Sequence, residues 1–496
     1  MTLVLPIVIP LLAAALLLVV PARAVLQRSV ALTASAGQLI AGLALFRQVQ
    51  VDGYLVLQVS DWAAPFGITL VADVLSSILV VAVGIVGVAV GASSFAGVDP
   101  RREAYGYHPL IQVLLMGVAG AFLTGDLFNL YVWFEVMLMA SFVLMALHRT
   151  SEQIAAAFKY VTINLLASAV FLTGLGLLYG SAGTLNMADL AAIWPARNEP
   201  VLDLVLATLF LTAFGIKAGL FPLFFWLPAS YPTPPAPIGA LFAGLLTKVG
   251  VYALIRVFSL LFRGGPPLPL QLLLWLSVAT MIVGLVGALA QRDFRRVLAF
   301  NLVGHIGFTT IGLPLGTTAA LAGSLLYIVH HILVITCLFF VAGVLLQLRR
   351  TTDLGRLGSL YRDHPGTAVL AMIPLFSLAG VPPLSGFVGK LAVVQGTFGA
   401  GAYGPGAAVL VVSLLTIVSM ARLWDEAFWK PADAPPVSPR PAPLLLVPVA
   451  ALGALILGMT VAAGPLFETT TRAAGQLLDP QGYIEAVLQS GLGRGE

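Results

Sequence analysis

Charged side chains are scarce in this sequence of 496 residues. Asp, Glu, Lys and Arg make up 9% of it and hydrophobic residues make up 59%, whereas a soluble domain carries about 25% charged residues. A water-soluble fold cannot bury that much apolar surface. Apolar runs recur from residue 1 almost to the C-terminus, and about 20 apolar residues span the ~30 Å hydrocarbon core of a bilayer. The composition therefore predicts an all-α polytopic membrane protein.

Cysteine is almost absent as well. Cys337 is the only one and lies in an apolar run, so the sequence has no disulfide framework, no CxxC pair and no ligand set for an iron–sulfur cluster or structural zinc. We therefore expect no cofactor and no metal. The formal charge of +4 comes from basic residues scattered singly through the loops, unlike the basic stripe of a nucleic-acid-binding protein. No nucleic-acid partner is expected.

Apolar runs between charged and turn residues predict about fourteen transmembrane helices. They begin near residues 3, 29, 68, 108, 127, 157, 200, 235, 269, 294, 318, 366, 405 and 443. Fourteen Lys and Arg residues fall in the odd-numbered loops and three in the even-numbered loops. Because cytoplasmic loops collect positive charge, this alternation places both termini on the outer side. Further apolar runs follow the uncharged first one, so we expect a retained helix there rather than a cleaved signal peptide.

The seventh and twelfth predicted helices contain similar interruptions. Their sequences are Lys217-Ala-Gly-Leu-Phe-Pro222-Leu and Leu378-Ala-Gly-Val-Pro-Pro383-Leu. Proline removes a backbone donor, and in lipid the freed carbonyls are tolerated only beside protein or a water-filled cavity. Breaks five helices apart indicate two five-helix repeats of opposite orientation, as in secondary transporters whose ion sites lie beside interrupted helices. Ordinary proline kinks in a helical bundle are the alternative.

This plan divides the chain into four parts. Residues 1–107 hold the first three helices, and residues 108–264 hold the first inverted repeat, helices four to eight. Residues 265–430 hold the second repeat, helices nine to thirteen, and each repeat is expected to contain one proton half-channel. Residues 431–496 hold the last helix and an amphipathic tail, which we expect along the outer membrane surface.

Four charged residues lie deep inside predicted helices, where each costs at least ~2.5 kcal/mol. They are Glu135 on the fifth helix, Lys217 before the break of the seventh, Lys248 on the eighth and Lys390 after the break of the twelfth. Burial disfavours the charged form of either residue type, and proximity of a carboxylate to a lysine restores both charges. Separating and rejoining such a pair therefore switches a lysine between releasing and holding a proton.

We therefore expect Glu135 to pair with Lys217. Lys248 and then Lys390 are the expected next stations, because a lysine that titrates near neutrality both accepts and donates protons. A static buried ion pair that fixes helix packing is the alternative. One carboxylate does not neutralise three lysines, which favours the relay.

Histidines lie between the last two lysines in helix order. His330 and His331 are neighbours on the eleventh helix, about 100° apart, so only one is expected to face the bundle axis. His331 is the candidate relay member, with His330 as an accessory residue. His305 on the tenth helix is a weaker candidate. Hydrogen-bonded packing and a bis-histidine haem site are the alternatives.

Three further positions are accessory candidates. Lys159 begins the sixth helix, where a long charged side chain is expected to reach the membrane interface. The alternative is that Lys159 tunes the environment of Glu135. Pro222 and Pro383 open the backbone at the two breaks.

Three stretches resemble the antiporter-like family shared by multisubunit Mrp-type cation/proton antiporters and the proton-pumping membrane subunits of respiratory complex I. They are TGDLFNLYVWFEVML, FGIKAGLFPLFFWLPASYPTPPAPIGALFAGLLTKVGVYALIR and AGVPPLSGFVGK. The likeness covers roughly residues 60–430 and is greatest to the Mrp D-type subunits. It places the family's buried glutamate and lysines on Glu135, Lys217, Lys248 and Lys390. Ile335, one turn beyond His331, stands where many relatives carry lysine, so His331 or water would serve there.

The resemblance implies a transporter subunit rather than an enzyme, a multi-pass protein of the bacterial cell membrane. Its partners would be the other Mrp-type subunits, A, B, C, E, F and G, and the lipid bilayer. The exchanged ions would be protons and Na+, with K+ or Li+ as further candidates. Na+ prefers a cage of oxygens, and no carboxylate cluster supplies one here, so another subunit is expected to hold it.

Three other functions fit the same sequence less well. A redox-driven subunit of complex I or of a membrane-bound hydrogenase would use the same buried axis. A carrier for a small solute would need more polar side chains outside that axis. A structural scaffold would leave three buried lysines unexplained.

Overall fold

Apolar helices dominate the computed structural model of the chain, which describes residues 2–20, 23–96, 98–147, 150–197, 199–432 and 443–489. Eleven helices of this described part are long and apolar enough to cross a membrane. Eight of them are α2 (Ala24–Asp52), α3 (Val74–Ser94), α6 (Leu127–Ala146), α7 (Ser151–Ala182), α9 (Pro200–Ala218), α13 (Leu268–Ala290), α16 (Thr318–Arg349) and α21 (Pro443–Val461). The predicted all-α membrane fold is confirmed.

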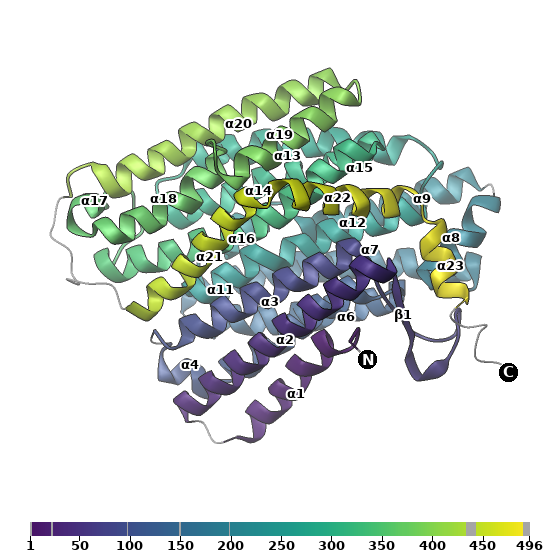
Figure 1. Cartoon of the computed structure of the whole chain (residues 1–496), viewed down its shortest axis with the longest axis horizontal. Coiled ribbons are helices and arrows are strands. Elements are labelled where there is room, and N and C mark those ends of the chain that lie inside the picture. Colours follow the sequence, from purple (N-terminus) through teal and green to yellow (C-terminus); the bar gives the residue numbers. More distant parts are fainter. Residues whose placement is uncertain are drawn as a thin grey trace.

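The other three long spans are composite. They are α11 (Ala236–Leu241) with a π turn and α12 (Thr247–Leu260), α14 (Phe294–Thr310) with α15 (Gly312–Leu315), and α20 (Tyr403–Trp424) with a π turn to Trp429. Three shorter apolar helices lie near other expected starts: α1 (Leu5–Val19), α5 (Tyr107–Leu123) and α18 (Pro365–Ala379). The helices lie side by side across the bundle (Figure 1). The number of fourteen spans stays a prediction.

Helix α16 runs through the interior of the bundle. All its residues from 320 to 342 are buried. Its neighbours include α11, α14, α18, α21, α19 (Ser385–Gly399) and α22 (Ala463–Leu478). Because protein surrounds α16 on all sides, a polar side chain at any angle around this helix faces other side chains rather than lipid.

Both predicted helix breaks are present. Helix α9 ends at Ala218 and is followed by Gly219 with φ 85°, and α18 ends at Ala379 and is followed by Gly380 with φ 84°. Glycine adopts this left-handed conformation without steric cost and commonly caps helices. The segments after the breaks differ, since α10 (Trp226–Ser230) has 5 residues and α19 has 15.

Helices α6 and α14, which occupy matching places in the two expected repeats, begin in the same way. An aspartate caps each one, Asp126 for α6 and Asp293 for α14. Beside each cap, two backbone hydrogen bonds of 2.8–2.9 Å join the chain to the loop after the next long helix. At α6, Leu127 N–H donates to Leu185 O and Met187 N–H donates to Gly125 O. At α14, Phe294 N–H donates to Thr352 O and Leu354 N–H donates to Arg292 O. These two bridges adjoin α8 (Met187–Ile193) and α17 (Leu360–Asp363), at opposite ends of the bundle in Figure 1. They support the inverted repeat, whose bounds stay a prediction.

A short hairpin and a short helix connect the first helices. Strands β1 (Leu55–Gln58) and β2 (Thr69–Ala72) pair antiparallel between α2 and α3, with Leu55 opposite Ala72. Helix α4 (Pro100–Ala104) precedes α5. Asp73 then caps α3 by accepting the backbone N–H of Ser76.

The C-terminal tail packs against the helical bundle, and its expected place along the outer membrane surface stays a prediction. Helix α22 follows α21 and runs beside α16 and α3 (Figure 1). Its apolar side chains Ala473, Ala474 and Leu477 are buried, because an amphipathic helix can bury its apolar side against a bundle as well as in a membrane surface. Helix α23 (Gln481–Gln489) packs against β1 and α8.

Candidate functional site

Glu135 on α6 and Lys217 on α9 are joined through a serine. Ser168 of α7 donates a hydrogen bond to Glu135 Oε1, and Lys217 Nζ donates to Ser168 Oγ at 3.2 Å. No direct ion pair between Glu135 and Lys217 is present in the described structure. The predicted pair is therefore a bridged pair. Sequence reasoning missed Ser168, because a serine inside a helix usually bonds only its own backbone.

Lys217 lies in the last turn of α9, beside a cavity of about 20 Å³. Tyr160, Asn164 and Trp226 are among the residues that line it. A cavity of this size holds about one water molecule. Lys217 Nζ also lies 4.6 Å from the centre of the Phe134 ring, and such a cation–π contact stabilises an ammonium group. The break in the seventh helix thus gives Lys217 both an aromatic contact and room for water.

Lys248 is buried at the start of α12, directly after the π turn Phe242–Leu246. Its Nζ donates to Ala243 O at 2.7 Å. A π turn interrupts the regular α-helical bonding, which is why such turns recur at functional sites. Two residues on, Gly250 lets α12 approach α9 closely, since a Cβ there would lie 2.5 Å from Ala218 N. The helices of Lys217 and Lys248 therefore meet at the break.

Both neighbouring histidines of α16 are inside the protein, so the expectation that only one faces inward is wrong. The His331 ring stacks on the His305 ring of α14 with centroids 5.1 Å apart. His330 Nδ1 lies 3.0 Å from Ser385 Oγ of α19. His305 Nδ1 is hydrogen-bonded to the Tyr327 hydroxyl. The reason is that α16 is enclosed all round, so no side of it faces lipid.

Lys390 on α19 completes this group. Its Nζ donates to Ala379 O at 2.9 Å, which is the last carbonyl of α18 before the second break. The Phe308 ring lies 5.8 Å from Nζ, and Gly380 leaves space for the side chain, since a Cβ there would lie 2.9 Å from Lys390 Cδ. Lys390 and Lys248 therefore share one arrangement, an ammonium group bonded to a backbone carbonyl beside an irregular turn.

His305, His330 and His331, with Tyr327 and Ser385, form a histidine cluster that lies between Lys248 and Lys390. Both Lys248 and Lys390 are close enough to act on His331 electrostatically. In the described structure, both ring nitrogens of His331 and Nε2 of His330 are buried without a hydrogen-bond partner. Buried polar atoms are normally satisfied by protein or by ordered water. The cluster thus has open positions for water or for a transferred proton.

Sequence reasoning also missed Tyr327 and Ser385 in this cluster. Neither is charged, so the cost of burying charge gave no signal for them. A further buried cation, Arg256 of α12, was not singled out either. Its guanidinium pairs with Asp73 at 2.5 Å, and both side chains are buried. Arg256 is a neutralised structural charge, unlike Lys248 and Lys390.

Lys159 does not belong to this group. It is exposed on α7 and lines a separate pocket with Arg295 and Arg296. It lies more than two helical turns from Ser168 along α7, and its expected influence on Glu135 stays a prediction. Pro222 and Pro383 lie just after Gly219 and Gly380, at the two breaks, as expected.

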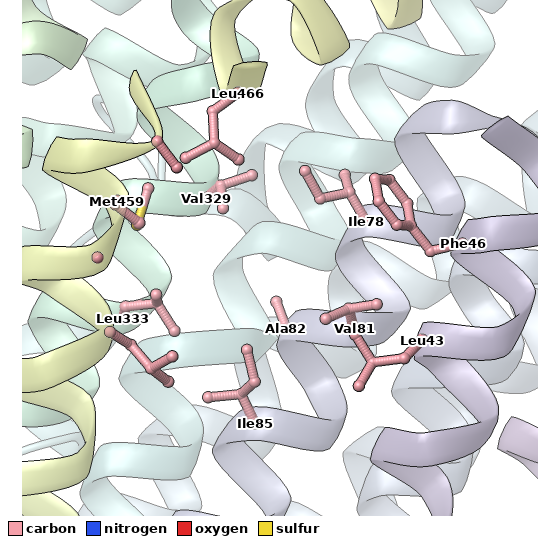
Figure 2. A pocket seen from close by; sticks show the side chains of 13 residues that line it. Leu43, Phe46, Ile78, Val81, Ala82, Ile85, Val329, Leu333, Met459 and Leu466 are labelled. Carbon is pink, nitrogen blue, oxygen red and sulfur yellow. The ribbon is translucent and has the colours of Figure 1, made fainter. Parts of the chain in front are cut away.

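Two other features are excluded from the site. A cavity of about 270 Å³ between α2, α3, α16, α21 and α22 is lined by apolar side chains alone (Figure 2), so it offers no group that carries a proton. The bis-histidine haem alternative does not fit either. His305 and His331 stack ring on ring at 5.1 Å, which leaves no space for a haem plane between them.

Comparisons with known proteins identify the family of this chain. Residues 124–416 match the family described as NADH:quinone oxidoreductase/Mrp antiporter, transmembrane. The D subunit of the Na(+)/H(+) antiporter of Alkalihalophilus pseudofirmus is 43% identical over 98% of this chain and 99% of its own, and that of Bacillus subtilis is 41% identical over 98% and 99%. A chain of the Mrp complex from Dietzia sp. DQ12-45-1b superposes with a TM-score of 0.91 at 31% identity, covering 98% of this chain and 99% of its own. The chain therefore belongs to the NADH:quinone oxidoreductase/Mrp antiporter family and, within it, to the D-type subunits of Na+/H+ antiporters.

Proposed function

We propose that this chain conducts protons for a multisubunit Na+/H+ antiporter, along a row that runs from the Glu135–Ser168–Lys217 bridge through Lys248 and the histidine cluster to Lys390. Relatives named as D-type antiporter subunits and a neighbour from an Mrp complex support assembly with other Mrp-type subunits. The observation that carries the proposal is that Lys248 and Lys390 are buried and bonded to backbone carbonyls instead of carboxylates.

A carbonyl partner suits a lysine that changes its protonation state. An ammonium and a neutral amine both have N–H groups to donate, so the carbonyl of Ala243 or Ala379 holds the side chain in either state. A carboxylate would stabilise only the charged form and would retain the proton. The static-pair alternative applies to Arg256 and Asp73, whereas these two lysines lack such a partner among the described residues.

The Ser168 bridge controls the first lysine. While Lys217 donates to Ser168 and Ser168 donates to Glu135, the carboxylate stabilises the ammonium through the hydroxyl. When the bridge opens, this stabilisation is lost and Lys217 gives its proton to water in the adjoining cavity. When the bridge closes again, Lys217 takes up another proton. The break after Ala218 supplies the freedom for this movement.

The histidine cluster bridges the distance between the other two lysines. His331 accepts a proton at whichever of its two ring nitrogens is unprotonated, since neither is held by a hydrogen bond, and His305, Tyr327 and His330 continue the row toward Ser385 and Lys390. A buried histidine cluster can take the place of the lysine that Ile335 replaces. Overall identities of 41–43% to antiporter subunits favour cation exchange over a redox-driven complex as the energy source.

Na+-induced pH change in everted vesicles tests the proposal. The whole complex is expressed in antiporter-deficient cells with wild-type chain, Lys217→Ala or Glu135→Ala, at equal assembly. Both variants are expected to lose exchange. Arg263→Ala removes an exposed loop charge and serves as the control with unchanged exchange. Wild-type rates in Lys217→Ala and Glu135→Ala would show that the buried charges are structural.

A further inference from the structure

An open pocket of about 610 Å³ lies at the end of the bundle where α7 begins and α13 passes into α14. Its walls come from both expected repeats. Its lining combines charged side chains, among them Lys159, Arg295 and Arg296, with apolar ones, among them Phe225 and Phe300. The loop between α13 and α14 is one of those rich in arginine, which places this end of the bundle in the cytoplasm.

The three cationic side chains of this pocket are not neutralised by protein. No ion pair involves Lys159, Arg295 or Arg296 in the described structure, and Arg295 Nε is buried without a hydrogen-bond partner. The carboxylate of Asp293, which also lines the pocket, already accepts two hydrogen bonds. One comes from the backbone N–H of Arg296 at 3.0 Å and the other from the Thr352 hydroxyl at 2.5 Å. The pocket thus presents unpaired positive charge.

The depth of the pocket matches the headgroup layer. Helix α7 has 32 residues and is about 48 Å long, so about 9 Å extends beyond each side of a ~30 Å hydrocarbon core. Lys159 lies about 12 Å along the helix, at the boundary between headgroups and hydrocarbon. Glu152, the other acidic residue of the lining, lies in the first turn of α7 and hence about 10 Å farther into the water.

Apolar side chains continue outward from the cationic group. Phe225, which lines the pocket, is 55% exposed. Phe158, the residue before Lys159, is 68% exposed. In a membrane, exposed aromatic side chains at this level contact acyl chains and headgroups. A ligand that fills this site must therefore carry negative charge at one end and hydrocarbon at the other.

We propose that this pocket binds the phosphate-bearing headgroup of an anionic phospholipid of the cytoplasmic leaflet. Arginine and lysine donate to phosphate oxygens, arginine in a bidentate fork, and basic pockets between transmembrane helices on this side of a membrane bind such headgroups. The acyl chains lie over Phe158 and Phe225. Because Lys159 comes from one expected repeat and Arg295 and Arg296 from the other, the bound lipid joins the two halves of the bundle.

The test measures phosphatidylglycerol retained by the purified whole complex after prolonged detergent washing. The variant K159Q/R295Q/R296Q is compared with wild type and with R292Q/R356Q/R362Q, which removes three exposed charges from the same end of the bundle outside the pocket. We expect the pocket variant to retain one phosphatidylglycerol fewer per complex, and the control variant to match wild type. Equal retention by all three overturns the proposal.

Two further measurements separate the possible occupants. Inorganic phosphate at millimolar concentration is expected to leave the retained lipid in place; its displacement would identify a soluble phosphate as the ligand and overturn the lipid site. A photoreactive probe on Ala229→Cys, in membranes of cells that express the complex, is expected to attach to lipid. Attachment to another subunit would show that protein fills the pocket. Cys337, the only other cysteine of this chain, is buried, so labelling within this chain is confined to the new cysteine.

Discussion

Ser168 lies between Glu135 and Lys217, donating to the carboxylate and accepting from the ammonium at 3.2 Å. A hydroxyl is both donor and acceptor, so it transmits the stabilisation of one charge by the other without direct contact. The hydroxyl also keeps the two charged groups apart, so their mutual Coulomb attraction is weaker than in a close ion pair.

Replacing Ser168 with alanine is expected to slow Na+-dependent proton exchange by about ten- to a hundredfold, since a hydrogen bond to a charged group contributes ~1.5–3 kcal/mol. Initial rates of pH change in everted vesicles measure the effect. Ser168→Thr keeps the hydroxyl and is expected to retain most of the exchange. Unchanged exchange in Ser168→Ala would remove the bridge from the transport path.

Replacing Tyr327 with phenylalanine tests the histidine cluster. The ring and its stacking against His305 remain, whereas the hydroxyl bonded to His305 Nδ1 is lost. We expect about a tenfold lower exchange rate with normal assembly, because one hydrogen bond of ~1 kcal/mol or more is removed from the row. If the Tyr327→Phe complex exchanges like wild type, protons do not pass through the hydrogen bond between Tyr327 and His305.

Gly380→Ala tests the second break. Its left-handed backbone, φ 84°, costs an alanine about 1–3 kcal/mol, and the new Cβ would press on Lys390 Cδ at 2.9 Å. We expect a lower thermal denaturation midpoint of the solubilised complex and slower exchange. Gly366→Ala, in the first turn of α18 with no neighbour within 4 Å, is the control. An equal midpoint in both variants would contradict the account.

The acid stability of the complex is expected to depend on Glu103 of α4. Burial alone would raise its pKa, but hydrogen bonds from Arg28 and His108 outweigh burial and hold the pKa of Glu103 below its usual value. The stabilisation is therefore complete above about pH 4.3, the ordinary glutamate pKa, and is lost as pH falls through the lower pKa of the folded state.

Thermal denaturation of wild type and Glu103→Gln at a series of pH values measures this dependence. The difference between their midpoints is expected to be largest near neutral pH and to shrink in acid. A difference that stays constant with pH would assign the effect of the variant to packing instead of charge.

The membrane fold could be predicted from the sequence because spans follow from hydrophobicity alone. Most of the predicted starts lie within a few residues of observed helix starts, and both breaks are where Pro222 and Pro383 indicated. The neighbours of the tail could not be predicted, since the amphipathicity of α22 does not reveal whether its apolar side faces lipid or α16.

The charged part of the site was predictable because burying charge is costly, which singled out Glu135, Lys217, Lys248 and Lys390. Ser168, Tyr327 and Ser385 were not, because uncharged hydroxyl groups are common in helices and cost little there. His330 was misjudged for another reason. The periodicity of one helix tells which side chains share a direction, whereas the number of directions that face protein depends on all its neighbours.

The paired backbone bridges beside Asp126 and Asp293 have a consequence for biosynthesis. Each bridge uses main-chain groups from one half of the chain only, Leu127 with Leu185 and Phe294 with Thr352. A growing chain can therefore close the first bridge as soon as α7 has been inserted, while the second half is still in the ribosome. Each half of the transporter is held at its own end by contacts within that half, whereas the packing around α16 needs helices from both halves.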